Sequence, residues 1–278
     1  MADISDSPLT SGAVEQLRRG LKGEVRHDDV ARVLYANDAS IYQIDATGVV
    51  TPRDTDDVVH CVRTAQEAGF SLLPRGGGTS LAGQAVGASV HLDFSRHMRE
   101  ILELNVEERW VRVQPGVVLD ELNAFLAPHG LQFGPDVSTS SRANLGGMIG
   151  NNSCGAHSIL YGKTIDHVID LTVVLADGEV TRLGSPETVG ADAVAGIQSI
   201  ESGLREHIPR IVQDYEEQIR ARFPAVMRRV SGYNLDALLP PAPLDLSRLV
   251  VGSEGTLCAI TEATLNLVER PQDSLVVA

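Results

Sequence analysis

The sequence has few cysteines and no long apolar run, and its first residues show no signal-peptide pattern. Its three cysteines, Cys61, Cys154 and Cys258, are separated by more than ninety residues each, which excludes a disulfide framework and the ligand spacing of zinc or iron–sulfur sites. No window reaches the roughly 18 uncharged apolar residues of a membrane span. The first residues, MADISDSPLTSG, lack the basic start and apolar run of a signal peptide. We therefore expect a cytoplasmic protein with no metal site and no membrane span.

Positive charge is also scarce. The 278 residues include 23 Lys+Arg against 37 Asp+Glu, so the formal net charge is −14. A polyanion would be repelled by this surplus of carboxylates, and we expect no nucleic-acid partner. The length suffices for one large domain or two closely packed lobes. Glycine, by contrast, is plentiful, and the 26 glycines are concentrated in a few loops.

From residue 47 onward the apolar pattern alternates between strand and helix spacing. One helix is expected to begin with Thr55 as its cap and to stop at Gly69, because glycine favours the left-handed backbone of a helix end. Pro209 is expected to kink or split an amphipathic helix over 195–222. The other expected helices are 13–21 and 117–130. The expected strands are 48–50, 70–73, 89–93, 101–105, 110–114, 168–175, 180–183 and 261–268.

Three consecutive glycines follow the strand 70–73, in the segment Pro74–Ser80 (PRGGGTS). Glycine permits positive φ angles and close backbone approach, so several N–H groups can converge on a phosphate or pyrophosphate. A mobile turn is the alternative interpretation of the same glycines. Arg75 either contacts the anion or lies on the surface, and we favour the surface. A dinucleotide fingerprint fails at Leu81 and a P-loop fails at His157, where each motif requires glycine.

Residues 134–164 form a long segment without clear periodicity, which we expect to be ordered and functional. Its first part combines glycines with small hydroxyl and amide side chains, as in loops that wrap a polar, extended ligand. A helix capped by Ser141 is the alternative, but it explains only the start of the segment. His157 is expected to orient this loop rather than move protons, and Cys154 to serve as small packing.

Four segments, in this order, resemble the successive FAD-contact loops of the vanillyl-alcohol-oxidase and p-cresol-methylhydroxylase superfamily. They are Pro74–Ser80, Pro135–Gly147, the Tyr161-Gly162 step and Glu254–Ile260. The sequence is most similar to the branch that includes D-lactate dehydrogenase, the glycolate oxidase FAD subunit, D-2-hydroxyglutarate dehydrogenase and alkyldihydroxyacetonephosphate synthase. Within this branch it looks most like bacterial proteins that fuse the flavin module to an iron–sulfur module.

The resemblance implies an α+β fold, a PCMH-type FAD-binding domain of two lobes with FAD between them. The implied divisions are a helical lead-in at 1–44, a first lobe at 45–110, a second lobe at 111–270 and a tail at 271–278 that leads to an absent substrate domain. Relatives with covalently bound flavin carry histidine where Thr79 stands, so noncovalent FAD is expected. Because the family's catalytic side chains follow the flavin lobes, no catalytic residue is assigned here.

The resemblance also implies which residues hold FAD. Gly76–Ser80 would bind the pyrophosphate, Asp136–Ser140 with Gly146 and Gly147 would follow the ribityl chain and ring, and main chain near Ile260 would face the adenine end. The implied cofactor contacts are Pro74, Arg75, Gly76, Gly77, Gly78, Thr79, Ser80, Pro135, Asp136, Thr139, Ser140, Gly146, Gly147, Asn151, Asn152, Ser153, Gly155, Glu254, Gly255 and Ile260.

The function implied by the resemblance is that of the FAD module of a flavin-dependent oxidoreductase. Its substrate would be D-lactate, glycolate or D-2-hydroxyglutarate, oxidised by hydride transfer to flavin N5. Electrons would pass to an iron–sulfur module, a quinone or another acceptor. The alternatives are a self-standing FAD-binding subunit that needs a partner chain and a non-catalytic flavin-binding domain. Tyr233 and Asn234 either face the substrate or cap the following helix.

Overall fold

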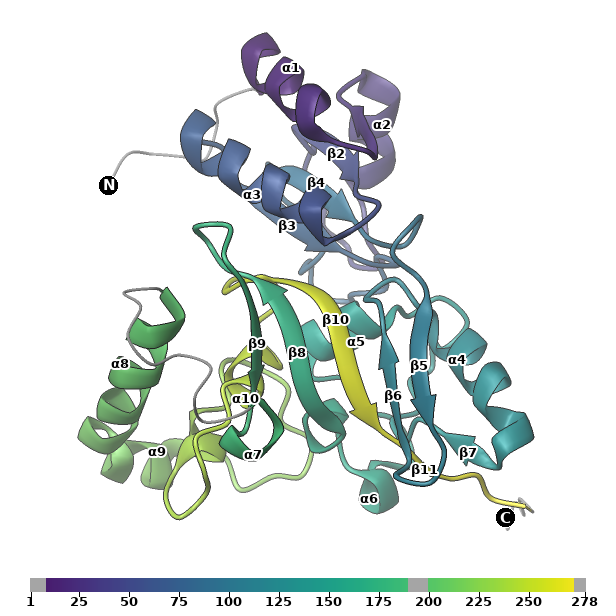
Figure 1. Cartoon of the computed structure of the whole chain (residues 1–278), viewed down its shortest axis with the longest axis vertical. Helices are drawn as coiled ribbons and strands as arrows, with labels where there is room; N and C mark the ends of the chain where they lie inside the picture. Colours follow the sequence, from purple (N-terminus) through teal and green to yellow (C-terminus); the bar gives the residue numbers. More distant parts are fainter. Residues whose placement is uncertain (1–8, 190–199, 273–278) are drawn as a thin grey trace.

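The computed structural model describes residues 9–189 and 200–272, which form two lobes, each built around its own sheet. The first lobe runs from α1 to β4 and the second from β5 to β11 (Figure 1). The expected tail at 271–278 lies mostly outside the described residues. Helices and strands are mixed within each lobe, which confirms the expected α+β class.

The first lobe has a four-stranded sheet in the order β1-β2-β4-β3, in which β1 is antiparallel and the other three strands are parallel. Its helices α1 and α3 pack their apolar faces onto the sheet, so that Leu17, Val58 and Val90 share one core. The elements are α1 (Ser11–Gly20), β1 (Glu24–Arg26), α2 (Asp29–Tyr35), β2 (Gly48–Thr51), α3 (Thr55–Ala68), β3 (Leu72–Arg75) and β4 (Val90–Asp93).

Helix α3 begins one residue earlier than expected. The cap is Asp54, whose carboxylate accepts a hydrogen bond from the Asp57 amide at 3.1 Å, and Thr55 is the first helical residue. Aspartate satisfies a free N–H at a helix start at least as well as threonine does, so the helix takes the earlier cap. Gly69 ends the helix in the left-handed conformation, at φ 73°, as expected.

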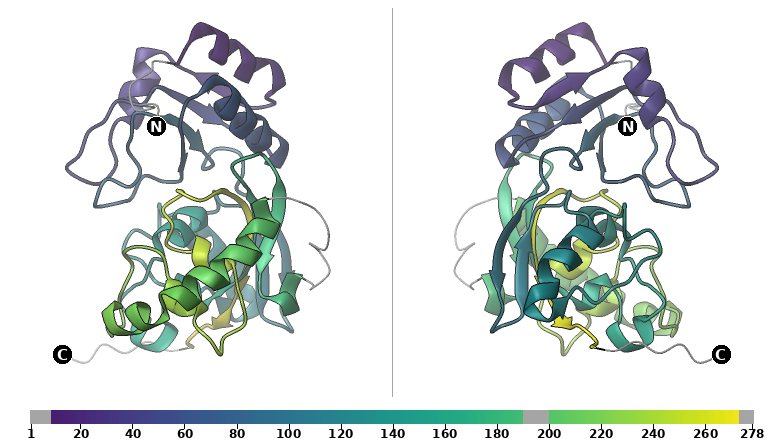
Figure 2. Two further views of the ribbon diagram at one scale, coloured as in Figure 1. Left: turned by 90° about the vertical axis from the view of Figure 1, so that its left-hand side faces the viewer. Right: turned by 90° about the vertical axis from the view of Figure 1, so that its right-hand side faces the viewer.

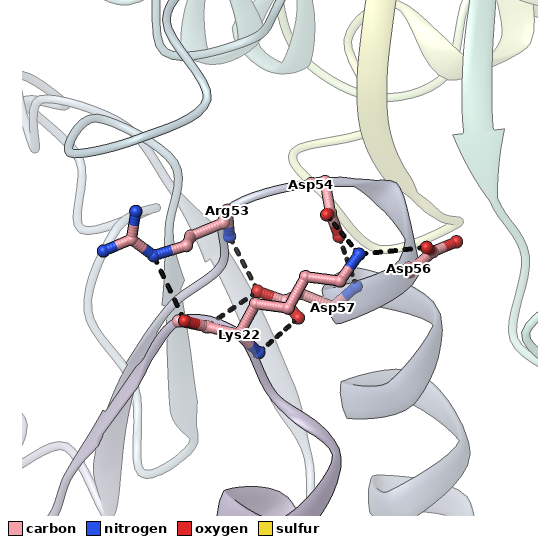
Figure 3. Close-up of polar contacts among 6 residues, drawn as sticks. Lys22, Arg53, Asp54, Asp56 and Asp57 are labelled. Carbon is pink, nitrogen blue, oxygen red and sulfur yellow. Dashed lines mark hydrogen bonds and ion pairs between the residues drawn. The ribbon is translucent and has the colours of Figure 1, made fainter.

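A buried aspartate fastens the N-terminal elements to α3 (Figure 3). The fully buried Asp57 carboxylate accepts hydrogen bonds from the backbone N–H groups of Lys22, Gly23 and Arg53, at 2.8, 3.0 and 2.8 Å. The Lys22 ammonium lies 2.5 Å from the Asp54 carboxylate. Strand β1 also pairs with β2. Residues 1–44 were expected to be a separate lead-in, but the described ones are an integral part of the first lobe.

The second lobe has an antiparallel sheet in the order β5-β6-β10-β8-β9. Helices α4, α5 and α10 lie on one face of this sheet and share its apolar core (Figure 1). Because β5 pairs with β6, the division between the lobes falls between β4 and β5 and not after residue 110 as expected. The elements are β5 (Ile101–Asn105), β6 (Trp110–Val113), α4 (Leu119–Leu126), β7 (Leu131–Gln132), α5 (Leu145–Asn151), β8 (Val168–Val174), β9 (Val180–Gly184), α10 (Ser247–Val250), β10 (Ala259–Asn266) and β11 (Val268–Glu269).

The remaining helices flank the second lobe. They are α6 (Ser158–Tyr161), α7 (Pro186–Val189), α8 (Ile200–Asp214) and α9 (Glu216–Arg222), with 3₁₀ turns at Ala127–His129, Thr164–Asp166 and Leu235–Leu238. Residues 195–199 of the expected helix lie outside the described residues. Pro209 lies within α8 without ending it. The helix ends instead at Asp214, and α9 begins after Tyr215. This break lets Val212 and Ile219 pack into the same small apolar cluster.

Candidate cofactor-binding site

A cavity of about 380 Å³ lies where the loops of the two lobes face each other. The first lobe contributes the end of β3, Pro74 and Arg75, and residues of the following loop up to Ala85. The second lobe contributes residues between Val137 and Cys154 and between Ser253 and Ile260. In both views of Figure 2, the first lobe, in purple and blue, faces the second lobe, in teal, green and yellow. A cavity of this size falls within the range typical of small-molecule sites.

The glycine loop lines this cavity with free hydrogen-bond donors. Within the described residues, none of the backbone N–H groups of residues 76–80 donates a hydrogen bond, and the hydroxyls of Thr79 and Ser80 have no partner. Backbone N–H groups seldom remain without an acceptor unless they face water or a ligand. The loop therefore has the donor chemistry that an anionic group such as a phosphate requires.

The three glycines are needed for two different reasons. Only Gly78 has a left-handed backbone, at φ 63°. A Cβ at Gly76 would lie 2.9 Å from the Asn144 Cβ, and one at Gly77 would lie 2.3 Å from the Arg142 carbonyl oxygen. The first two glycines thus allow the loop of the first lobe to press against residues 142–144 of the second.

Arg75 holds the glycine loop to its neighbours. Its guanidinium donates to the carbonyl oxygens of Tyr35, Ala85 and Asn37, at 3.1, 2.5 and 2.7 Å, and stacks over the Tyr35 ring. Burial lowers the pKa of Arg75 from its ordinary value. The surface position favoured from the sequence is therefore wrong, because the guanidinium is half-buried and bound by three carbonyl groups.

The glycine loop forms one wall of the cavity. A second wall is formed by α5 and the residues before it. A Cβ at Gly146 would lie 2.6 Å from the Pro115 Cβ, whereas a Cβ at Gly147 would meet no atom within 4 Å. The helix begins after Asn144, not at Ser141 as the alternative interpretation held. Short helices such as α5 and α6 explain why residues 134–164 show no clear periodicity.

Asn144 is a residue of this wall that the sequence interpretation missed. It is 3% exposed, lines the cavity and donates from Nδ2 to the Gly116 carbonyl oxygen at 2.6 Å, while its Oδ1 has no hydrogen-bond partner. A buried acceptor without a partner is costly, so it favours a ligand or water that donates to it. An Asn just before the Gly146-Gly147 pair is the only signal that the sequence offered.

The third wall carries a carboxylate. Glu254 Oε1 accepts hydrogen bonds from Asn151 Nδ2 at 2.8 Å and from Gln84 Nε2 at 3.4 Å. Desolvation by burial raises the pKa of Glu254 above its ordinary value. Gln84 comes from the first lobe and Asn151 from α5, so Glu254 links both sides of the cavity. Gln84 was not among the expected site residues.

Most of the expected cofactor contacts line this cavity, including Thr139, Asn151, Ser153, Gly255 and Ile260. The expected contacts that do not line it are Pro135, Asp136, Ser140, Asn152 and Gly155.

Three of these five residues make contacts that hold the lining segments in place without facing the cavity themselves. Asp136 accepts from the His157 amide at 3.1 Å and lies 2.5 Å from His157 Nδ1, which is the loop-orienting contact expected of that histidine. Gly155 packs against Asp136 so closely that a Cβ would lie 1.8 Å from its carbonyl oxygen. Asn152 is fully buried and accepts from the Ile165 amide at 3.0 Å.

Other candidate residues take structural or lining positions. Asn234 donates to the Val251 carbonyl oxygen at 2.7 Å and makes no side-chain cap, and the Tyr233 hydroxyl contacts the Thr256 hydroxyl at 2.9 Å. Cys154 and Cys258 both line the cavity, and desolvation raises the pKa of Cys258 to about 12. Among the described residues, no cluster of three metal-ligating side chains occurs, and no helix is both long and apolar enough to cross a bilayer.

Comparison with known proteins decides the family. Residues 46–184 match the family model described as FAD binding domain. The chain belongs to this family. FAD is thus the cofactor, as expected. The residues present fit it, because the cavity offers unpaired N–H groups at 76–80 and open space at Gly147.

The chain is similar to much longer proteins. It is 40% identical over 259 residues to a D-2-hydroxyglutarate dehydrogenase of Pantoea ananatis, covering 91% of this chain and 25% of that protein. It is 31% identical over 268 residues to glycolate oxidase subunit GlcD of Bacillus subtilis, covering 95% of this chain and 46% of that protein. A solved structure of alkyldihydroxyacetonephosphate synthase is similar to this chain, with a TM-score of 0.68 and 20% sequence identity. The match covers 98% of this chain and 46% of the synthase chain, and it supports the fold alone.

Proposed function

We propose that this chain binds FAD noncovalently in the cavity between its lobes and forms the flavin-binding part of a dehydrogenase that oxidises a D-2-hydroxy acid. The observation that carries the proposal is the row of unpaired N–H groups at residues 76–80 that lines the cavity. The similarity to D-2-hydroxyglutarate dehydrogenases over 91% of the chain supports the substrate class. D-2-Hydroxyglutarate is the first substrate to test, followed by D-lactate and glycolate.

Each wall has a distinct part in holding the cofactor. The N–H groups of residues 76–80 would bind the diphosphate, and Arg75 would keep that loop in shape through its bonds to neighbouring carbonyls. The bare Cα of Gly147 would leave room for the flat ring against α5. Bound FAD would supply the hydride acceptor, while these residues place it and exclude water.

The chemistry of Thr79 and Cys258, which line the cavity, supports noncovalent attachment. Thr79 has no ring nitrogen that could bond to flavin, and no histidine lines the cavity among the described residues. The raised pKa of Cys258 keeps its thiol neutral and weakly nucleophilic. Acid precipitation of the FAD-loaded protein should release all the yellow colour into the supernatant. Colour retained in the pellet would contradict this part of the proposal.

The complete activity is proposed to need more than this chain. Since the chain covers 25% of its D-2-hydroxyglutarate dehydrogenase relative, we assign the substrate-binding groups to a further domain or partner chain. Electrons would leave to an iron–sulfur module or another acceptor in the same cytoplasmic compartment. The three cysteines, which form no disulfide in the structure, are compatible with that reducing location.

Two measurements test the proposal. Titration of the purified chain with FAD should give saturable quenching of flavin fluorescence, and absence of binding would refute it. Anaerobic addition of D-2-hydroxyglutarate to the full-length protein should then bleach the flavin, with the L-enantiomer as control. Bleaching by neither D-2-hydroxyglutarate, D-lactate nor glycolate would leave flavin binding intact but exclude the proposed substrate class.

A further inference from the structure

A tight turn of the first lobe, at residues 37–43, lies against the glycine loop. It follows α2 and is closed by a bridge between Asn37 and Gln43. The match to the family model begins only at residue 46, and none of the turn's residues lines the cavity. The turn therefore has no place among the implied cofactor contacts, but its hydrogen bonds reach the loop that carries the unpaired N–H groups.

The turn fixes one peptide unit in the middle of the glycine loop. The Ala39 N–H donates to the Gly78 carbonyl oxygen at 3.0 Å. In a trans peptide unit the C=O and N–H groups point in opposite directions, so this bond directs the Thr79 N–H away from the turn. At the start of the loop, the Phe94 N–H binds the Arg75 carbonyl oxygen in the same way, at 3.1 Å. Two peptide units that carry unpaired N–H groups are thus held from outside the loop.

Asp38 ties the same turn to the residues that follow the glycines. Its Oδ1 accepts a hydrogen bond from the Ser40 N–H at 2.8 Å, and its Oδ2 accepts one from the Ala85 N–H at 3.3 Å. The Ala85 carbonyl oxygen in turn accepts a hydrogen bond from the Arg75 guanidinium at 2.5 Å. One carboxylate oxygen therefore shapes the turn, while the other connects the turn to the far end of the loop.

We propose that Asp38 and Ala39 are positioning residues that hold the loop at 76–80 in the conformation that binds the diphosphate of FAD. This assignment rests on the proposed binding of FAD. Glycine leaves the backbone free to rotate, so the three consecutive glycines would otherwise spread their N–H groups over many directions. Donors that are already oriented bind an anion more tightly, because less conformational freedom is lost on binding. Both residues act through the loop, since neither lines the cavity.

Two variants remove these contacts separately. Ala39→Pro deletes the N–H that binds Gly78, at a position that does not have positive φ. Asp38→Ala removes both acceptors of the carboxylate. Asp177→Ala is the matched control, because it removes a similar bond from the Glu179 N–H, at 2.9 Å, in the turn between β8 and β9. We expect the melting temperature of the FAD-free chain to fall by no more than about 2–4 °C in all three variants.

Dissociation constants are measured for FAD, ADP and riboflavin. FAD and ADP contain the diphosphate, so positioning predicts about 10-fold weaker binding of both by Ala39→Pro and by Asp38→Ala. Riboflavin lacks the diphosphate and should bind each variant as it binds the wild type. Ala39→Ser keeps the backbone N–H and should bind all three ligands with wild-type affinity, as should Asp177→Ala.

The outcomes separate this assignment from the proposed function. If the wild-type chain binds no FAD, both are refuted. If it binds FAD but Ala39→Pro and Asp38→Ala do so within about twofold of the wild type, only this assignment is overturned. It is also overturned if riboflavin binding weakens as much as FAD binding, or if ADP binding stays unchanged, because the loss would then not concern the diphosphate. A melting temperature far below that of Asp177→Ala would make the turn a structural support of the lobe instead.

Discussion

In the first lobe, the backbone N–H groups of Lys22, Gly23 and Arg53 converge on the Asp57 carboxylate, whereas those of residues 76–80 have no acceptor within the described residues. The first set is satisfied by an anion of the chain itself, completely buried. The second set lines a cavity and, under the proposed function, would bind the diphosphate of FAD. The same donor chemistry would then serve folding in one loop and, as proposed, cofactor binding in the other.

The largest effect is expected where the acceptor is internal. Asp57→Ala removes the buried acceptor of three backbone N–H groups and detaches the α1–β1 turn from α3. We expect a loss of about 3–5 kcal/mol in the free energy of unfolding, measured by urea denaturation. The fraction that remains folded should bind FAD within twofold of wild type. A stability loss below about 1 kcal/mol would show that the turn does not depend on Asp57.

Acid should destabilise the first lobe through His91, a buried histidine on β4. Desolvation lowers the pKa of His91 to about 4, so the folded protein keeps the imidazole neutral while the unfolded chain takes up a proton below about 6.5. The unfolded state then binds more protons, and stability falls as the pH drops from about 6.5 to 4, by up to about 3 kcal/mol.

The measurement is urea denaturation across this pH window. His91→Gln cannot titrate but can still donate to the Gly87 carbonyl oxygen, which the His91 ring contacts at 3.1 Å. It should flatten the pH dependence by about the amount attributed to His91. His27→Gln, at an exposed position, is the control. An unchanged slope in His91→Gln would assign the acid sensitivity to other groups.

The sequence revealed the loop at 76–80 because its signal is local. Three glycines after a buried strand can be recognised without knowing what they touch, and most helix and strand segments follow from equally local periodicity, whereas the α+β class was implied by the family resemblance. Asn144 and Gln84 were missed because their partners, Gly116 and Glu254, are 28 and 170 residues away.

Interpretations that failed did so for the same physical reason. Arg75 was assigned to the surface because nothing near it in sequence shows the carbonyl groups of residues 35–37, which bind it from 38 and 40 residues away. The lobe boundary was placed after residue 110 because the pairing of β5 with β6 depends on register between strands. Tertiary contacts, rather than local propensity, decide both.

The smallest changes in stability are expected at two glycines, Gly77 in the loop after β3 and Gly147 in α5, whose surroundings differ. Gly77→Ala places a methyl group 2.3 Å from the Arg142 carbonyl oxygen, so the loop must move away from the second lobe. We expect a loss of about 1–3 kcal/mol in stability and at least about 10-fold weaker FAD binding. Gly147→Ala meets no atom within 4 Å and lies in α5, so it should instead stabilise the FAD-free chain by about 0.5–1 kcal/mol.

Gly147→Ala decides whether the cavity is shaped for a ligand that touches α5. The methyl group projects into open space, which a flat ring lying against the helix would occupy, so FAD affinity should fall about 10-fold even though the protein is more stable. Gly203→Ala, also in a helix and also with nothing within 4 Å, is the matched control and should leave FAD affinity unchanged. Both values come from thermal unfolding without FAD and fluorescence titration with it. If Gly147→Ala binds FAD as tightly as wild type, the ring does not lie against α5, and glycine there serves only the packing of the helix.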